Sequence, residues 1–209
     1  MTRLFIARHG ETVYNAAARM QGDAMDTPLT RNGFGQADEM GEGLKRFFGE
    51  EMPELELWAS PFGRALQTIA IVCEHIGQDW DGCRRDARLA EINVGLWGGR
   101  TYREIMDELG PIVDLEHGLF SVRPPQGEWY DDIARRLTSW LDEHGRHGPD
   151  KIVLMHGMSS RVLRGLLLGL EPDPRWSAPI APSLPQGSMV MIESGVETLV
   201  HLGRGKAPA

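Results

Sequence analysis

The sequence predicts an α/β fold: a three-layer α/β/α sandwich with a mostly parallel central sheet and an inserted lid-like region. Short apolar runs recur along the chain, as expected for parallel strands that are buried on both faces. Segments with apolar residues every three to four positions follow these runs, which is typical of amphipathic helices packed on a sheet. The alternation breaks down across residues 92–129, which indicates an insertion or lid over one end of the sheet.

The predicted strands are short and bounded by turn residues. The first is the apolar run Leu4–Ala7, and a second spans residues 55–60. Residues 151–155 repeat the pattern of the first run, because both are followed closely by a His-Gly pair. Residues 188–193 and 197–202 alternate around a Ser-Gly pair and predict a closing hairpin.

The predicted helices follow these strands in order. Residues 11–20 are Ala-rich and predict a short helix, and Thr30 is suited to cap the next helix, which Gly49 ends. Pro61 suits the first turn of a helix that stops near Gly77. Apolar stripes predict two later helices, one through Ile133, Leu137, Trp140 and Leu141, and one through Val162, Leu163, Leu166, Leu167 and Leu170.

The middle of the chain has weaker patterns. Residues 85–91 are compatible with a short strand, residues 94–100 form a Gly-rich loop, and Thr101 is suited to cap a short helix. Residues 111–126 show little periodicity. We therefore interpret 92–129 as the insertion or lid within a single domain of residues 1–209.

Composition excludes several classes of function. The formal net charge is −8 and no basic run is present, which argues against a nucleic-acid surface. Cys73 and Cys83 form no disulfide framework, and no apolar stretch has the length of a signal peptide core or a membrane span, so we expect a cytoplasmic protein. An acidic protein that handles anions must gather its cations in one pocket.

Three predicted strands are followed by matching side chains. Arg8 and His9 follow the first, Ser60 and then Arg64 follow the second, and His156 follows the late one. The carboxyl ends of parallel strands share one sheet edge, so these groups are expected to meet there. Guanidinium groups bind phosphate oxygens, and an imidazole nitrogen can attack phosphorus or move a proton. The alternative for any single pair, such as Arg8-His9, is a solvent-facing turn.

The ordered set of motifs resembles the histidine phosphatase (phosphoglycerate mutase-like) superfamily, and its phosphatase branch in particular. The resemblance covers nearly the whole chain. It is carried by Arg8-His9-Gly10-Glu11-Thr12, Asn15, Gln21-Gly22, Asp26-x-Pro28-Leu29-Thr30, Gly33-x-x-Gln36-Ala37, Ser60-Pro61-x-x-Arg64-Ala65-x-Gln67-Thr68, Leu89-x-Glu91, Gly95-x-Trp97 and His156-Gly157.

The resemblance implies catalytic roles for five residues. His9 would attack phosphorus and form a phosphohistidine, while Arg8, Arg64 and His156 would hold the phosphoryl oxygens. Glu91 would protonate the leaving alkoxide and then activate water; its alternative is a carboxylate paired with an arginine. His9 would have to be unprotonated on the attacking nitrogen, with His156 as the donor of the pair.

Substrate binding is implied for Asn15, Gln21, Gly22 and Gly157. The first three are equally compatible with plain turn residues. Three positions depart from the family pattern, namely Gly98 in place of a glutamate, Trp129 where serine is common, and Met158 where a smaller residue is frequent. These departures are expected to alter the rim of the pocket and hence the substrate. Trp97 and Trp129 are equally compatible with core aromatics.

No cofactor or metal site is indicated. The remaining histidines, His75, His117, His144, His147 and His201, lack the carboxylate or cysteine spacing of metal ligands, and no nucleotide-binding glycine motif is present. The expected partner is a small phosphorylated metabolite, with a homodimer left open, and neither nucleic acid nor membrane is expected.

Three functions are compatible with this site. The favoured one is a metal-independent phosphatase that acts on small phosphomonoesters through phosphohistidine. The alternative is phosphoglycerate mutase-type transfer by the same histidine, which must shield its intermediate from water. The third is a phosphate-binding module without turnover.

Overall fold

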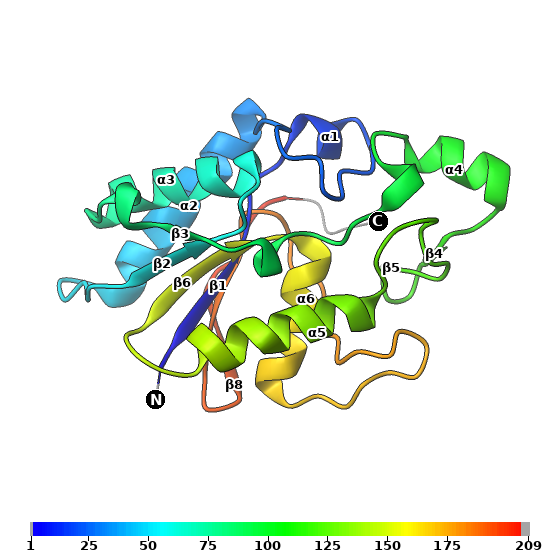
Figure 1. Ribbon diagram of the computed structural model, residues 1–209. Helices are drawn as coiled ribbons and strands as arrows, with labels where there is room; N and C mark the ends of the chain where they lie inside the picture. The colour runs from blue at the N-terminus through cyan, green and yellow to red at the C-terminus, as the bar shows by residue number, and fades with distance from the viewer. Residues whose placement is uncertain (1, 206–209) are drawn as a thin grey trace.

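The computed structural model describes residues 2–205 and shows a sheet between two helical layers (Figure 1). The central sheet has six strands in the order β3-β2-β6-β1-β7-β8. Their bounds are β1 Leu4–Arg8, β2 Glu56–Ala59, β3 Arg84–Arg85, β6 Lys151–Met155, β7 Met189–Glu193 and β8 Val196–His201. The predicted α/β class, with a mostly parallel sheet, is confirmed.

Strand β1 lies inside the sheet and has no exposed residue. It pairs in parallel with β6, with Arg8 opposite Met155, and antiparallel with β7. Strands β2 and β3 continue the parallel part on the far side of β6. The carboxyl ends of β2, β6 and β1 are therefore neighbours along one edge of the sheet.

Helices α2 (Arg31–Phe48) and α3 (Gly63–Ile76) cover one face of the sheet, and α5 (Tyr130–Trp140) and α6 (Gly157–Leu168) cover the other (Figure 1). The alternation of side chains along β1 explains the division. Phe5 and Ala7 belong to the cluster with α2 and α3, whereas Leu4 and Ile6 belong to the cluster with α5 and α6. Both faces are apolar, which is why the strands read as continuous apolar runs.

Smaller elements gather beyond the carboxyl end of β1 (Figure 1). They are α1 (Val13–Ala16), α4 (Tyr102–Leu109) and the two-stranded ribbon of β4 (Val113–Asp114) and β5 (Leu119–Phe120). Short 3₁₀ turns lie between α3 and α4, namely η1 (Trp80–Gly82), η2 (Ala87–Leu89) and η3 (Gly95–Trp97). Residues of the predicted insertion, 92–129, contribute to the wall of a cavity at this end, among them Ile92, Val94, Tyr102, Met106 and Val113.

The structure differs from the expected elements in three places. Residues 85–91 are only briefly a strand, because the Asp86 carboxylate accepts a hydrogen bond from the Arg88 N–H (2.8 Å) and turns the chain into η2. The ribbon β4–β5 was missed because each strand has only two residues. Helix α1 is shorter than the predicted 11–20, because Ala18 has a positive φ of 49°.

The helix after α5 also departs from simple α geometry. The π-helix η4 (Leu141–Gly145) continues α5, and the Arg146 N–H donates to the Leu141 carbonyl. Of the predicted domain 1–209, Met1 and residues 206–209 lie outside the described residues. Across the described part of the chain, every helix is too short or too polar to cross a bilayer.

Candidate active site

The cationic and imidazole groups predicted from three strand ends lie together. Arg8 ends β1 and His9 follows it, Arg64 lies in the first turn of α3 after β2, and His156 lies between β6 and α6. All four are buried. The rings of His9 and His156 are 5.1 Å apart between centroids. Arg8, His9 and Arg64 line a cavity of about 420 Å³ that also includes Glu91.

The ring of His9 is held in one tautomer. Its Nδ1 lies 2.7 Å from the Gly10 carbonyl oxygen, which can only accept, so Nδ1 carries the proton. Burial, followed by the charges of Arg64 and Arg8, holds the pKa of His9 well below its ordinary value of 6.5. The neutral ring therefore keeps a lone pair on Nε2, as a nucleophile requires.

His156 has the opposite tautomer. Arg64 Nε donates to His156 Nδ1 (3.2 Å), so the proton of the neutral ring lies on Nε2. Burial, and then the charge of Arg64, holds the pKa of His156 well below 6.5. Nε2 is buried and has no protein partner among the described residues. It is thus a neutral donor without an acceptor, a few ångströms from the other imidazole.

Arg8 offers a second donor of this kind. One end of its guanidinium donates to the Leu184 carbonyl (2.7 Å), whereas Nε is buried without a partner. Burial lowers the pKa of Arg8 to about 10, so the group remains a cation at neutral pH. A Cβ on Gly157 would lie 3.4 Å from the guanidinium atoms, so this glycine gives Arg8 its space.

Arg64 has a more structural role than the sequence suggested. Its Nη1 donates to the Ala24 carbonyl (2.6 Å) and the Thr27 hydroxyl (3.2 Å), and Nη2 donates to the Gly22 carbonyl (2.8 Å). With the bond to His156, four of its five N–H groups are used. Arg64 therefore fixes the 22–27 loop and the His156 ring, and has one N–H left for a ligand.

Glu91 is anchored at the N-terminus of α6 rather than to an arginine. Its Oε1 accepts from the N–H of Ser159 (2.9 Å) and from its neighbour Ile92 (3.0 Å), and its Oε2 accepts from Met158 (3.1 Å). A carboxylate is favoured at a helix N-terminus by the unpaired N–H groups and the helix dipole. No ion pair joins Glu91 to an arginine among the described residues. The carboxylate also lines the cavity.

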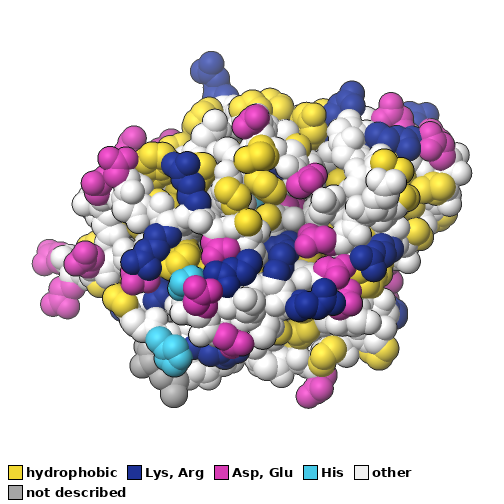
Figure 2. Space-filling view, in the orientation of Figure 1, with side chains coloured by type: hydrophobic (Ala, Val, Ile, Leu, Met, Phe, Trp, Pro, Cys, Tyr) yellow, Lys and Arg dark blue, Asp and Glu magenta, His cyan; other side chains and the backbone are white. Residues whose placement is uncertain are grey.

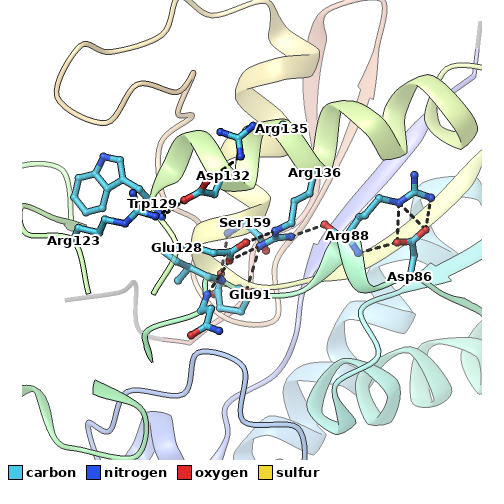
Figure 3. A network of polar contacts seen from close by, with 12 residues as sticks. Asp86, Arg88, Glu91, Arg123, Glu128, Trp129, Asp132, Arg135, Arg136 and Ser159 are labelled. Carbon is cyan, nitrogen blue, oxygen red and sulfur yellow. Dashed lines mark hydrogen bonds and ion pairs between the residues drawn. The ribbon is translucent and has the colours of Figure 1, made fainter. Parts of the chain in front are cut away.

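The backbone around Glu91 is held by an ion pair from helix α5 (Figure 3). Arg136 donates to both carboxylate oxygens of Glu128 (3.0 and 3.2 Å) and to the carbonyls of Arg88 (2.5 Å) and Glu91 (3.3 Å). Glu128 in turn accepts from the N–H of Asn93 (2.9 Å). Sequence analysis missed Arg136. Glu128 belongs to a Pro-x-Gly-Glu pattern, but nothing in the sequence links the two side chains.

The expected substrate-binding residues all border the cavity, in different ways. Asn15 and Gln21 line it, and their side-chain oxygens lie 3.0 and 2.7 Å from the Thr12 hydroxyl, whose one O–H they share. Gly22 also lines it with a positive φ of 50°, and a Cβ there would lie 2.5 Å from Val94 Cγ2. Gly157 lines the cavity beside Arg8. Asn15, Gln21 and Gly22 thus also maintain the shape of the segment after β1.

The departures from the family pattern have separate outcomes. Met158 lines the cavity, whereas Trp97 is buried in the core and Trp129 packs on Tyr130. Gly98 and both tryptophans lie outside the cavity lining. Tyr102 lines it although sequence analysis did not single it out; burial, with the charge of Glu91, raises its pKa to about 12.

The arrangement suits a tetrahedral anion. Two buried N–H donors without partners, Arg8 Nε and His156 Nε2, lie around a histidine whose free nitrogen carries a lone pair. Arg8 lines the cavity and His156 lies behind the His9 ring. Leaving a buried donor unpaired costs roughly 1–3 kcal/mol, so such groups beside a cavity indicate a missing acceptor. A phosphoryl group would satisfy both donors and place phosphorus next to the nucleophile.

Known proteins resemble the chain over most of its length. The sequence profile of the histidine phosphatase superfamily (branch 1) matches residues 4–203. The protein named probable phosphoglycerate mutase GpmB of Erwinia tasmaniensis is 32% identical to this chain over 182 residues. The match covers 83% of this chain and 78% of the relative. The protein of the same name from Yersinia pestis is 30% identical over 177 residues, covering 81% and 76%.

Solved structures share the fold. A mycobacterial glucosyl-3-phosphoglycerate phosphatase, solved in complex with VO3, is 28% identical to this chain and superposes with a TM-score of 0.74. The match covers 99% of this chain and 100% of the mycobacterial chain. YhfR of Bacillus stearothermophilus is 28% identical with a TM-score of 0.70, covering 95% of each chain.

Proposed function

The chain belongs to the histidine phosphatase superfamily, and on that premise we propose that it is a phosphatase that hydrolyses small phosphomonoesters through a phosphohistidine on His9. The carrying observation is the state of His9: it is buried, fixed by the Gly10 carbonyl and left with its lone pair on Nε2 beside cationic groups. Such a ring is a nucleophile at neutral pH.

The reaction would proceed in two steps. In the first, His9 Nε2 bonds to phosphorus, the ester P–O bond breaks, and the Glu91 carboxylate passes the proton of the phosphomonoester monoanion to the leaving alkoxide. In the second, Glu91 takes a proton from water as the water attacks phosphorus, and the bond to Nε2 breaks to release phosphate. Arg8, His156 Nε2–H and the remaining Arg64 N–H would offset the charge on the phosphoryl oxygens. The arginines supply the positive charge, so the proposal requires no metal ion.

The alternative is phosphoglycerate mutase-type transfer by the same histidine, which the name of the GpmB relatives favours. A mutase must return the phosphoryl group to a second position of its substrate and keep water away meanwhile. The names of the structural neighbours favour hydrolysis instead. A phosphate-binding module without turnover would need the N–H donors of Arg8 and His156 but would not need the lone pair on His9 Nε2.

One set of assays separates these functions. The protein is incubated with p-nitrophenyl phosphate, and with 3-phosphoglycerate plus its bisphosphate primer, in EDTA. The proposal predicts phosphate release that persists in chelator and is abolished in His9→Asn. His147→Asn is the matched control, because His147 is also followed by glycine but is exposed and outside the cavity. Interconversion of phosphoglycerates without release, or binding without turnover, would overturn the proposal.

A further inference from the structure

The cavity has two chemically different halves. The inner half holds the reacting groups, Arg8, His9, Arg64 and Glu91. The outer half is mostly apolar and comes from the segment after α1, the 92–94 segment, α4 and the β4–β5 ribbon. Its walls include Met20, Ile92, Val94, Met106, Val113 and Phe120.

This apolar surface continues beyond the main cavity. An adjoining hollow of about 330 Å³ is lined by Met106, Gly110, Pro111, Val113 and Leu115 without any charged residue. The two hollows share Met106, Val113 and Leu115. Leu115 is 89% exposed and Met106 40% exposed, so apolar side chains reach the mouth. In Figure 2 charges of both signs lie over α4 and α5, with apolar side chains between them.

The outer half has one cation, Arg19, among the described residues that line the cavity. Its charged side chains are Glu11 and Arg19, and Glu11 already accepts from the Thr30 hydroxyl (2.7 Å). Arg19 donates to the Gly99 carbonyl (2.7 Å) and lies near the carboxylate of Glu104, whose pKa its charge helps to lower. A carboxylate or second phosphate here would meet the exposed guanidinium of Arg19, where an ion pair contributes roughly 0–1 kcal/mol, less than the burial of two methylenes.

We propose, on the basis of the proposed phosphatase activity, that the preferred substrates are monophosphate esters with an apolar alcohol part, either a long alkyl chain or an aromatic group. The phosphoryl group occupies the inner half and the apolar part lies along Val94, Met106 and Val113. Each methylene buried there contributes about 0.8 kcal/mol, which corresponds to roughly a fourfold gain in kcat/KM. Esters that carry a second anion are poor substrates.

The test uses unbranched alkyl phosphates from ethyl to octyl, below their micelle concentrations. Their leaving groups have nearly the same chemistry, so a change in rate along the series reports burial of the chain. We expect kcat/KM to rise by roughly three- to fourfold per methylene until the cavity is filled. Glycerol phosphate and 3-phosphoglycerate should be turned over more slowly than hexyl phosphate.

Two variants on α4 test whether the chain-length dependence of kcat/KM arises in the cavity. Met106→Gln should flatten the chain-length dependence, with a loss of kcat/KM that grows from ethyl to octyl phosphate. Leu109→Gln is the matched control, because Leu109 is 55% exposed on the same helix and lines neither hollow. It should leave the whole series unchanged.

The outcomes distinguish this inference from the function on which it rests. If no ester releases phosphate in a His9-dependent manner, the proposed function itself fails. If release occurs but kcat/KM is independent of chain length, or 3-phosphoglycerate is faster than hexyl phosphate, the phosphatase stands and the apolar substrate class is wrong.

Discussion

His9 and His156 are held in opposite tautomers by a carbonyl oxygen and a guanidinium N–H. The Gly10 carbonyl accepts a hydrogen bond from Nδ1 of His9, whereas Arg64 Nε donates one to Nδ1 of His156. One ring therefore presents a lone pair and the other an N–H. This pairing divides attack on phosphorus and oxygen binding between two residues of the same type, and the division depends on both rings remaining neutral.

Their burial predicts a dependence of stability on pH. Both histidines have folded pKa values below 6.5, so below that pH the unfolded chain binds more protons and stability falls as the pH is lowered. Each ring contributes a slope of up to about 1.4 kcal/mol per pH unit between its unfolded and folded pKa values. Urea denaturation from pH 7 to pH 5 should show a shallower slope in His9→Gln than in the natural protein. Parallel curves would contradict the buried neutral state of His9.

Glu91 predicts a dependence on the leaving group. An alkoxide needs a proton as it departs, whereas p-nitrophenolate does not, so Glu91→Gln should reduce kcat for alkyl phosphates by roughly 10²- to 10⁴-fold and for p-nitrophenyl phosphate by much less. Steady-state kinetics on both substrates measure the difference. Equal losses would instead point to the anchoring of α6, where Glu91 accepts from Met158 and Ser159.

Helix α5 controls the position of Glu91 through the Arg136–Glu128 pair (Figure 3). Arg136→Met removes four hydrogen bonds and leaves Glu128 without its cation, so we expect a loss of about 2–4 kcal/mol of stability. Because the Glu91 backbone is released, alkyl phosphates should lose more activity than aryl ones. Folding free energy and the alkyl-to-aryl ratio of kcat are the two readouts.

Arg135→Met provides the matched control on the same helix. Arg135 is exposed and pairs with Asp131 and Asp132 at the surface, where an ion pair is worth roughly 0–1 kcal/mol. It should change neither the alkyl-to-aryl ratio nor the stability by much. An unchanged ratio in Arg136→Met as well would mean that Glu91 is positioned by α6 alone.

Elements with enough residues to show a pattern could be predicted from the sequence, and short ones could not. Helix α2 begins after the Thr30 cap and ends at Gly49 as expected, and the hairpin of β7 and β8 was also correct. The ribbon β4–β5 and the turn η2 depend on single contacts, such as Asp86 with Arg88, which periodicity does not register. The sequence therefore predicts the elements in which buried residues recur at a regular spacing.

At the scale of the whole molecule, the distribution of charge matters more than its sum. The chain has a formal net charge of −8, yet Arg8 and Arg64 are buried at one sheet edge, where Arg8 Nε and His156 Nε2 have no acceptor among the described residues. An anion bound there should stabilise the folded protein, because it binds the folded state and not the unfolded one.

Vanadate or phosphate is the appropriate probe for that stabilisation. At 100 times its Kd, a ligand adds about 2.7 kcal/mol, which for a chain of this size raises Tm by roughly 5–10 °C. Thermal denaturation should show this rise in the natural protein and not in Arg8→Met. Arg46→Met, at an exposed position on α2, should respond like the natural protein. An equal rise in Arg8→Met would place the anion elsewhere.

The sequence by itself determined the α/β class, the order of the long elements and the identity of the four strand-end residues, because these depend on periodic burial and on a sheet whose parallel strands end at one edge. It also pointed to Glu91. Only the tertiary structure decided which nitrogen of His9 is free, that Arg64 spends most of its donors on the 22–27 loop, that Glu91 caps α6, and that the outer cavity is apolar. The reason is physical: tautomers, donor use and cavity walls are set by contacts between residues far apart in the chain, such as Glu91 with Ser159, which have no period and no fixed spacing.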